Sequence, residues 1–298
     1  MAAINLYLFG LPRIVYQGRA IEVERRKAIA LVTYLAFAEQ PQSRDALATM
    51  LWPDLDQDRA RAALRSTLPA LTSLFPERWL AADRQTIRLK YEAVWVDARE
   101  FLALLAKSRS HQHPADTVCP ECLSLLEYAI ALYHEDFLTG FTLADSVEYD
   151  DWQMFQRGWL RRACTLALRK VAGYYGSEGH YDSALVYARR WLALDPLHEP
   201  AHRLVMQLYA ASGQRAEALR QYQECVSILD SELATPPEEE TTALYEDIKA
   251  NTATSFPKAV AITPAYGVLP PLPQLVVGRE RVLQELKERV GIGSETGK

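Results

Sequence analysis

The sequence predicts a mainly α-helical protein, with short strands in its first 97 residues and helical repeats in its second half. Three observations lead to this prediction. Apolar and polar side chains alternate over the first 25 residues, as they do in strands, and a period of 3.6 residues replaces that alternation from about Ala28. From Asp97 onward the pattern is helical, and from about Val171 it repeats at a shift of 34 residues.

Length and composition indicate a globular protein of about two domains. The chain has 298 residues, of which 49% are hydrophobic. No run approaches the roughly 18 to 20 apolar residues that a membrane helix needs. The N-terminus lacks the basic start and the cleavage site of a signal peptide. We therefore expect a cytoplasmic protein without membrane contact.

The formal net charge of -5 is unevenly distributed. Residues 1–97 carry 13 basic and 11 acidic side chains, a net of +2, whereas the remainder carries 20 and 27, a net of -7. Phosphate contacts need only a local basic face, so the acidic second part does not exclude nucleic-acid binding. The alternative is an ordinary solvated surface.

The elements of the first domain follow from local signals. Strands are expected on either side of a turn at Gln17-Gly18, followed by a helix with one apolar face that ends before Pro41. Ser43 is a suitable N-cap for a second helix over 44–51, which Trp52-Pro53 ends. The apolar positions of these segments are Leu6, Leu8, Ile14, Tyr16, Ile21 and Val23, then Ala28, Leu31, Val32 and Leu35.

A third helix is expected over 58–75, followed by a hairpin of strands 79–82 and 86–90. On a helical wheel its apolar side chains (Ala60, Leu64, Leu68, Leu71 and Phe75) lie opposite Ala62, Arg65, Ser66, Pro69 and Ser73, with Arg59 and Arg61 at the flanks. Strands, three helices and a hairpin in this order are typical of a winged helix-turn-helix, whose third helix enters the major groove of DNA.

The second domain, residues 98–250, is predicted to be a tetratricopeptide-like stack of helices. Helices over 98–107, 119–133 and 148–173 precede or pack on the repeats. The shift of 34 residues pairs Val171 with Val205, Tyr175 with Tyr209, Gly179 with Gly213, Ala184 with Ala218, Leu185 with Leu219 and Leu194 with Ile228. Stacked repeats of this kind form an extended binding surface.

The C-terminal segments differ in character from both domains. Residues 251–273 contain five prolines without periodicity and are predicted to be a linker, and residues 274–298 are too few to form a domain.

The four cysteines are expected to be thiols in a reducing cytosol. Cys164 and Cys225 lie among apolar neighbours in helical patterns and are predicted to be buried. His111, His113, Cys119 and Cys122 lie within twelve residues and offer the imidazole and thiolate ligands that structural zinc prefers. The spacing C-x-x-C is typical of zinc sites, whereas H-x-H replaces the commoner H-x₃₋₅-H, and the alternative is a polar loop.

Several motifs together resemble those of the Streptomyces antibiotic regulatory proteins, whose first domain is similar to the effector domain of OmpR-type response regulators. In the first domain they are Leu6-Tyr-Leu-Phe-Gly, Arg26-Lys-Ala, Ser43-Arg-Asp-Ala-Leu, Leu51-Trp-Pro and Ala60-Arg-Ala-Ala-Leu-Arg. The second domain resembles the bacterial transcriptional activator domain of that family in Leu132-Tyr-His-Glu-Asp-Phe-Leu-Thr-Gly-Phe, Ala184-Leu-Val-Tyr-Ala-Arg-Arg and Leu194-Asp-Pro-Leu-His-Glu-Pro-Ala-His-Arg-Leu.

This resemblance implies a promoter-binding transcription activator, with residues 1–97 on double-stranded DNA. Arg61, Arg65 and Ser66 would then face bases or phosphates, while Arg44 and the wing-tip residues Arg84 and Gln85 would hold the backbone. The alternative for each arginine is a solvated side chain. Pro69 inside the third helix and the absence of basic residues after it depart from the family pattern, which leaves a thin DNA-binding face.

The repeat domain is expected to contact RNA polymerase or a second copy of the chain. Residues 275–286 resemble the segment that opens the signal-transducing ATPase module of long family members, so we expect the chain to be part of a longer regulator. Residues 291–298 do not match a P-loop, and no catalytic motif is present, so no enzyme activity is expected. The rival hypothesis is an interaction scaffold, the sensor arm of an ATPase switch without effective DNA binding.

Overall fold

The computed structural model describes residues 4–38, 40–75, 79–111, 113–114, 117–252 and 256. Their contacts divide the chain into two compact units. The winged-helix unit consists of residues 23–91 and 143–152, and the helical unit consists of the described residues of 4–22, 92–142 and 153–256. Most of the expected linker and the whole tail over 274–298 lie outside the described residues.

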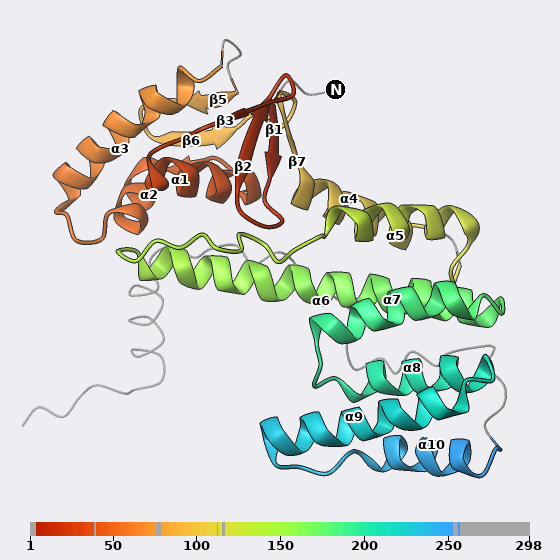
Figure 1. Ribbon diagram of the computed structural model, residues 1–298. Helices are drawn as coiled ribbons and strands as arrows, with labels where there is room; N and C mark the ends of the chain where they lie inside the picture. The colour runs from red at the N-terminus through yellow and green to blue at the C-terminus, as the bar shows by residue number, and fades with distance from the viewer. Residues whose placement is uncertain are drawn as a thin grey trace, which may run out of the picture. The chain divides into compact units, whose positions relative to one another are not determined.

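In its described residues, the winged-helix unit contains three whole helices, three short strands and, over 147–152, the start of a long helix. In chain order, the whole helices and the strands are α1 (Arg26–Phe37), β4 (Gln42–Ser43), α2 (Arg44–Leu51), α3 (Gln57–Thr72), β5 (Leu80–Ala82) and β6 (Thr86–Leu89). The strands form an antiparallel sheet in the order β4-β6-β5. Figure 1 labels α1, α2, α3, β5 and β6 of this unit. This arrangement confirms the winged helix-turn-helix that the sequence predicts.

Local capping explains where α2 and α3 begin. The Ser43 side chain accepts a hydrogen bond from the N–H of Ala46 at 3.5 Å, as its predicted N-cap role requires. Asp56 does the same for α3, accepting from the N–H of Arg59 at 3.0 Å. The end of α3 was predicted at residue 75, but the helix ends at Thr72, and the buried Phe75 ring packs against Trp79 beyond it.

Residues 143–152 complete the winged-helix unit from a distant part of the chain. The Thr33 and Tyr149 hydroxyl oxygens lie 2.7 Å apart in the interior, and the Tyr34 and Trp152 rings pack edge to face. Lys27 on α1 forms an ion pair of 2.6 Å with Asp145. These contacts, of sequence separation near 120, could not be inferred from local patterns.

The helical unit begins with a four-stranded sheet. Its strands are β1 (Ile4–Tyr7), β2 (Arg13–Tyr16), β3 (Arg19–Ile21) and β7 (Val94–Val96), in the order β3-β2-β1-β7. The strand β7, which the sequence did not predict, pairs in parallel with β1. The helices are α4 (Asp97–Arg109), α5 (Pro120–Leu132), α6 (Val147–Ser177), α7 (Tyr181–Leu194), α8 (Glu199–Ala211), α9 (Arg215–Leu233) and α10 (Glu239–Lys249). Of α6, only the part from residue 153 onward belongs to this unit.

The segment after β1 is held within the helical unit by rings and hydrogen bonds. The Phe9 ring lies 5.5 Å from that of Phe101 and 4.6 Å from that of Tyr133. The N–H of Leu138 donates to the Leu8 carbonyl at 2.8 Å. Buried Asp97, at the start of α4, accepts from the N–H groups of Leu8 and Phe9. The residues of β1, β2 and β3 therefore belong to the helical unit, whereas the sequence prediction placed them in a domain over residues 1–97.

The repeats that the 34-residue shift predicts are present in α6–α9, and Figure 1 shows α7 to α10 as a stack of antiparallel helices. The paired glycines Gly179 and Gly213 both end a helix in the left-handed region, with φ of +78° and +77°. The same backbone hydrogen bond recurs at both turns. The His180 N–H donates to the Tyr175 carbonyl, and the Gln214 N–H donates to the Tyr209 carbonyl, both at 2.8 Å.

Cys164 and Cys225 are buried free thiols, as predicted. Within the described residues, no helix has the length and apolar character that crossing a membrane requires.

Candidate nucleic-acid interface

The six predicted DNA-binding residues all lie in the winged-helix unit. Arg44 begins α2, whereas Arg61, Arg65 and Ser66 lie on α3. Arg84 and Gln85 lie in the turn between β5 and β6, which is the wing. The buried face of α3 (Ala60, Leu64, Thr67, Leu68 and Leu71) packs into the unit, and this leaves the arginines on the opposite side.

Arg61 is engaged within the protein. Its Nε lies 2.6 Å from Asp45 Oδ1 and its Nη2 lies 2.7 Å from Asp45 Oδ2, a bidentate ion pair between α3 and α2. Asp58 adds a second carboxylate at 3.7 Å from Nη1. Hydrogen bonding to Arg61 lowers the pKa of Asp45, and the Asp45 carboxylate raises that of Arg61. The pair is exposed to solvent, so salt and a competing phosphate can weaken it.

Arg65 and Ser66 lie one turn further along α3 and are exposed. Among the described residues, Arg65 has no ion pair or side-chain hydrogen bond that fixes it. The Ser66 hydroxyl donates to the Ala63 carbonyl at 2.8 Å, and the Ser66 carbonyl accepts from Arg25 Nη1 at 3.2 Å. Arg65 is thus the arginine of α3 whose guanidinium is available to an external anion.

The wing tip is a rigid turn built on Asp83. Its carboxylate accepts from the N–H groups of Gln85 and Thr86, each at 2.7 Å, and from the Thr86 hydroxyl at 3.0 Å. These bonds, led by that of the Thr86 N–H, hold the pKa of Asp83 below its usual value. Arg84 and Gln85 are exposed at this turn. The turn therefore presents the side chains of one cation and one amide to solvent.

Arg44 ties α2 to the wing. Its Nη1 donates to the Asp83 carbonyl at 2.6 Å, and its backbone N–H donates to the Gln85 carbonyl at 2.8 Å. The two-residue strand β4 extends this link by pairing with β6. The side chain that the sequence assigns to the DNA backbone therefore also positions the wing.

Pro69 separates the last residues of α3 from its basic part. The helix continues three residues beyond it to Thr72, although Pro69 has no N–H to offer the Arg65 carbonyl. The exposed residues after Pro69 are Ala70 and Thr72 in the helix and Ser73 at its C-cap, which carry no charge. The basic face of α3 is therefore confined to the part before Pro69.

Two residues of this surface escaped the sequence reasoning. The role of Asp45 was not predicted, because its ion pair with Arg61 joins two different helices. Arg25 reaches the Ser66 carbonyl from the start of α1. The basic run Arg25-Arg-Lys was a signal that could have revealed it.

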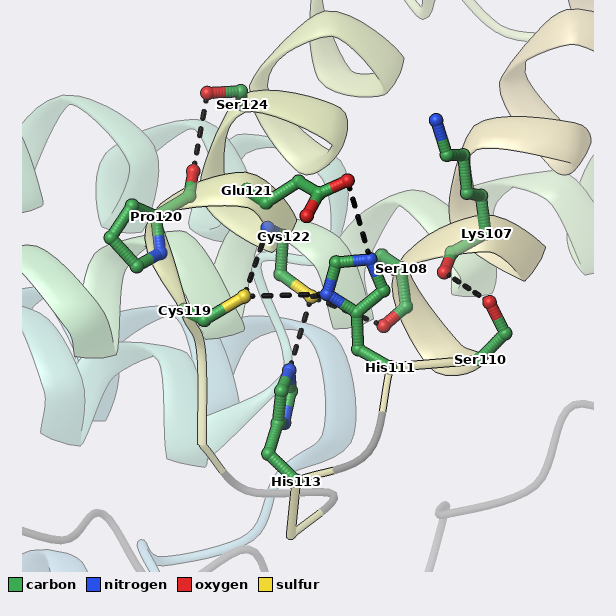
Figure 2. A network of polar contacts seen from close by, with 10 residues as sticks. All are labelled: Lys107, Ser108, Ser110, His111, His113, Cys119, Pro120, Glu121, Cys122 and Ser124. Atoms are coloured by element: carbon green, nitrogen blue, oxygen red, sulfur yellow. Dashed lines mark hydrogen bonds and ion pairs between the residues drawn. The ribbon is translucent and has the colours of Figure 1, made fainter.

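The predicted metal ligands lie elsewhere, in the helical unit, and the fold brings all four together. The ligand atoms of His111, His113, Cys119 and Cys122 lie within 4.8 Å of one another (Figure 2). Hydrogen bonds from the Cys122 N–H and from His111 lower the pKa of Cys119 to about 6, whereas burial raises that of Cys122.

Comparisons with known proteins identify the second domain. The family model described as the bacterial transcriptional activator domain matches residues 96–249, more than half of the chain. EmbR of Mycobacterium tuberculosis, solved in complex with a low affinity phosphopeptide, shares the fold with a TM-score of 0.66 and 20% sequence identity. The alignment covers 87% of this chain and 67% of that one. No curated protein sequence matches the chain. The chain belongs to the family of proteins that contain the bacterial transcriptional activator domain.

Proposed function

We propose that the chain is a sequence-specific DNA-binding transcription regulator, in which α3 enters the major groove and the wing contacts the adjacent backbone. The observation that carries the proposal is the exposed Arg65 on the outward face of α3, one turn after Arg61 and next to Ser66. An arginine at this place in a winged helix can read a guanine edge with two hydrogen bonds. The family assignment supports a role in transcription activation.

The wing supports the same proposal. Asp83 fixes its turn, so Arg84 reaches a phosphate at little conformational cost. Arg44 links the wing to α2, and its remaining N–H groups can donate to phosphates of the DNA backbone. The helical repeats then contact RNA polymerase or a second copy of the chain.

The ion pair between Arg61 and Asp45 favours a second candidate function, an interaction scaffold without effective DNA binding. A carboxylate beside α3 repels phosphate, and Asp58 and Asp83 add to the repulsion. Promoter DNA has to displace Arg61 from Asp45 before this arginine can contact it.

Binding to a duplex selected from a random-sequence pool tests the proposal. Arg65→Ala should weaken specific binding by about 5- to 150-fold, the equivalent of one base-edge contact. Asp45→Asn should strengthen binding, because it frees Arg61 and removes a negative charge. The matched control is Arg162→Ala, which removes an exposed arginine from α6 in the helical unit.

Fluorescence anisotropy at several salt concentrations gives the affinity and its salt slope. Loss of a phosphate contact should reduce the slope by about one. Equal affinities for Arg65→Ala, Arg162→Ala and wild type, with circular dichroism confirming the fold, would exclude α3 as the recognition helix. Failure of the pool to yield any preferred duplex would favour the scaffold.

A further inference from the structure

We propose that His111, His113, Cys119 and Cys122 bind one structural zinc ion that locks the connection between α4 and α5. The two histidines lie in the loop after α4, and the two cysteines lie at the N-cap and in the first turn of α5. All four residues belong to the helical unit, and none of them is among the residues proposed to bind DNA.

The spacing of the ligand atoms fits a tetrahedral ion. His111 Nδ1 lies 3.4 Å from Cys119 Sγ and 3.2 Å from Cys122 Sγ, and His113 Nε2 lies 3.1 Å from Cys122 Sγ. Zinc bonds of about 2.3 Å to sulfur and about 2.0–2.1 Å to nitrogen give a tetrahedron whose nitrogen–sulfur edge is about 3.6 Å. The three nitrogen–sulfur separations would have to widen by a few tenths of an ångström, and the remaining separations, none above 4.8 Å, would adjust to the same tetrahedron.

Both imidazoles are oriented by a second contact, as metal-binding histidines usually are. The remaining ring nitrogen of His111, Nε2, lies 3.7 Å from Glu121 Oε1. His113 Nδ1 lies 3.0 Å from the Pro114 carbonyl oxygen, to which it can donate its proton. Each contact leaves the lone pair of the other nitrogen directed at the sulfurs (Figure 2).

The two sulfurs are also positioned by the backbone. Cys119 is the N-cap of α5, and its Sγ accepts from the N–H of Cys122 at 3.4 Å. This N–H and the helix N-terminus stabilise a thiolate, the form that binds zinc. Cys122 is buried and its thiol contacts the Ser108 carbonyl at 3.3 Å. Metal binding replaces that proton, so this contact is given up when zinc enters.

The ligand set decides both the metal and its role. Two sulfurs and two imidazoles favour zinc over metals that prefer oxygen ligands. Four protein ligands leave no open position for a substrate, so the ion is structural. It fixes a loop of little apolar content between the two helices. One of these helices carries Phe101 and the other leads into Tyr133, and these rings hold Phe9.

The test measures metal in the full chain, purified under reducing conditions without chelator or affinity metal. Elemental analysis should find about one zinc per chain. Removing it with a chelator and adding Co²⁺ should give the visible bands of tetrahedral cobalt and thiolate charge-transfer absorption. Cys119→Ser/Cys122→Ser should abolish both signals, whereas the matched control Cys164→Ser/Cys225→Ser should retain them.

A milder variant and a thiol titration keep the test informative if the double variant fails to fold. Glu121→Ala should weaken zinc binding by about 10- to 100-fold, because it removes the orienting partner of His111. In the wild type, a mercurial reagent that blocks two thiols should release one zinc. A metal content near zero with no tetrahedral cobalt spectrum would overturn the proposal, as would zinc retained in the Cys119→Ser/Cys122→Ser variant.

Discussion

Asp97 gives a prediction whose sign and size can be worked out from the structure. Its carboxylate is 1% exposed and accepts hydrogen bonds from the N–H groups of Leu8, Phe9 and Ala98 at 2.7–3.1 Å. Burial outweighs these bonds and raises the pKa of Asp97 from 3.8 to about 6. The protonated form is therefore favoured by folding, so its stabilising contribution is complete below pH 3.8 and is lost as the pH rises through 6.

The perturbation is Asp97→Asn, which keeps the shape but does not titrate. One acceptor oxygen becomes an NH₂ group facing a buried N–H, which costs about 1–3 kcal/mol at every pH. For a pKa shift from 3.8 to about 6, this group lowers the free energy of unfolding of the wild type by about 2 kcal/mol between pH 4.5 and 7.5. The variant has no such group and does not show this loss. The variant should therefore be more destabilised relative to wild type at pH 4.5 than at pH 7.5.

The assay is urea unfolding followed by circular dichroism at four pH values between these limits. A chelator is present throughout, so that release of metal in acid does not contribute. Taking the difference between variant and wild type cancels all other titrating groups. A difference that stays constant with pH would refute the raised pKa, and one that grows toward pH 7.5 would show that the ionised form is the stabilised one.

Three further predictions concern the helices and the boundary between units. Pro69→Ala should stabilise the protein by about 1–2 kcal/mol, because the new N–H can pair with the Arg65 carbonyl in α3; a lower melting temperature would contradict this. Gly213→Ala should cost about 1 kcal/mol, since the residue has φ of +77° and a Cβ would meet nothing within 4 Å. The control Gly158→Ala, at an equally open position within α6, should stabilise slightly; equal thermal shifts in the two variants would refute the argument. A fragment of residues 1–97 should lose hydrogen-exchange protection in β1, because it lacks the helices that cover Phe9; protection as strong as in the full chain would show that the strands need no such cover.

Features set by neighbouring residues could be predicted from the sequence. The bounds of α2 were predicted to the residue, because Ser43 caps the helix and Trp52-Pro53 ends it. The repeats were predicted because a turn that needs glycine recurs after 34 residues. The clustering of the four proposed metal ligands was predicted because they lie within twelve residues, so chain connectivity alone keeps them close.

Features set by distant residues could not be predicted. The strand β7 has only three residues, and its partner β1 lies about ninety positions earlier. Residues 143–152, which complete the winged-helix unit, also contact residues that lie far from them in the sequence. Within the candidate interface, the helical wheel placed Arg65 opposite the apolar face of α3 and Arg61 at its flank, and neither arginine lies on the buried face. The wheel could not reveal that Asp45 engages one arginine and leaves the other free.

The most direct test of DNA recognition through α3 is selection of genomic fragments by the wild-type chain and by Arg65→Ala at two salt concentrations. A specific binder loses nonspecific fragments as the salt rises, because counterion release drives nonspecific binding. The wild type should retain a defined set of fragments sharing one sequence at the higher salt, and Arg65→Ala should lose that set. Retention of the same set by both proteins, or of no defined set by the wild type, would contradict the account.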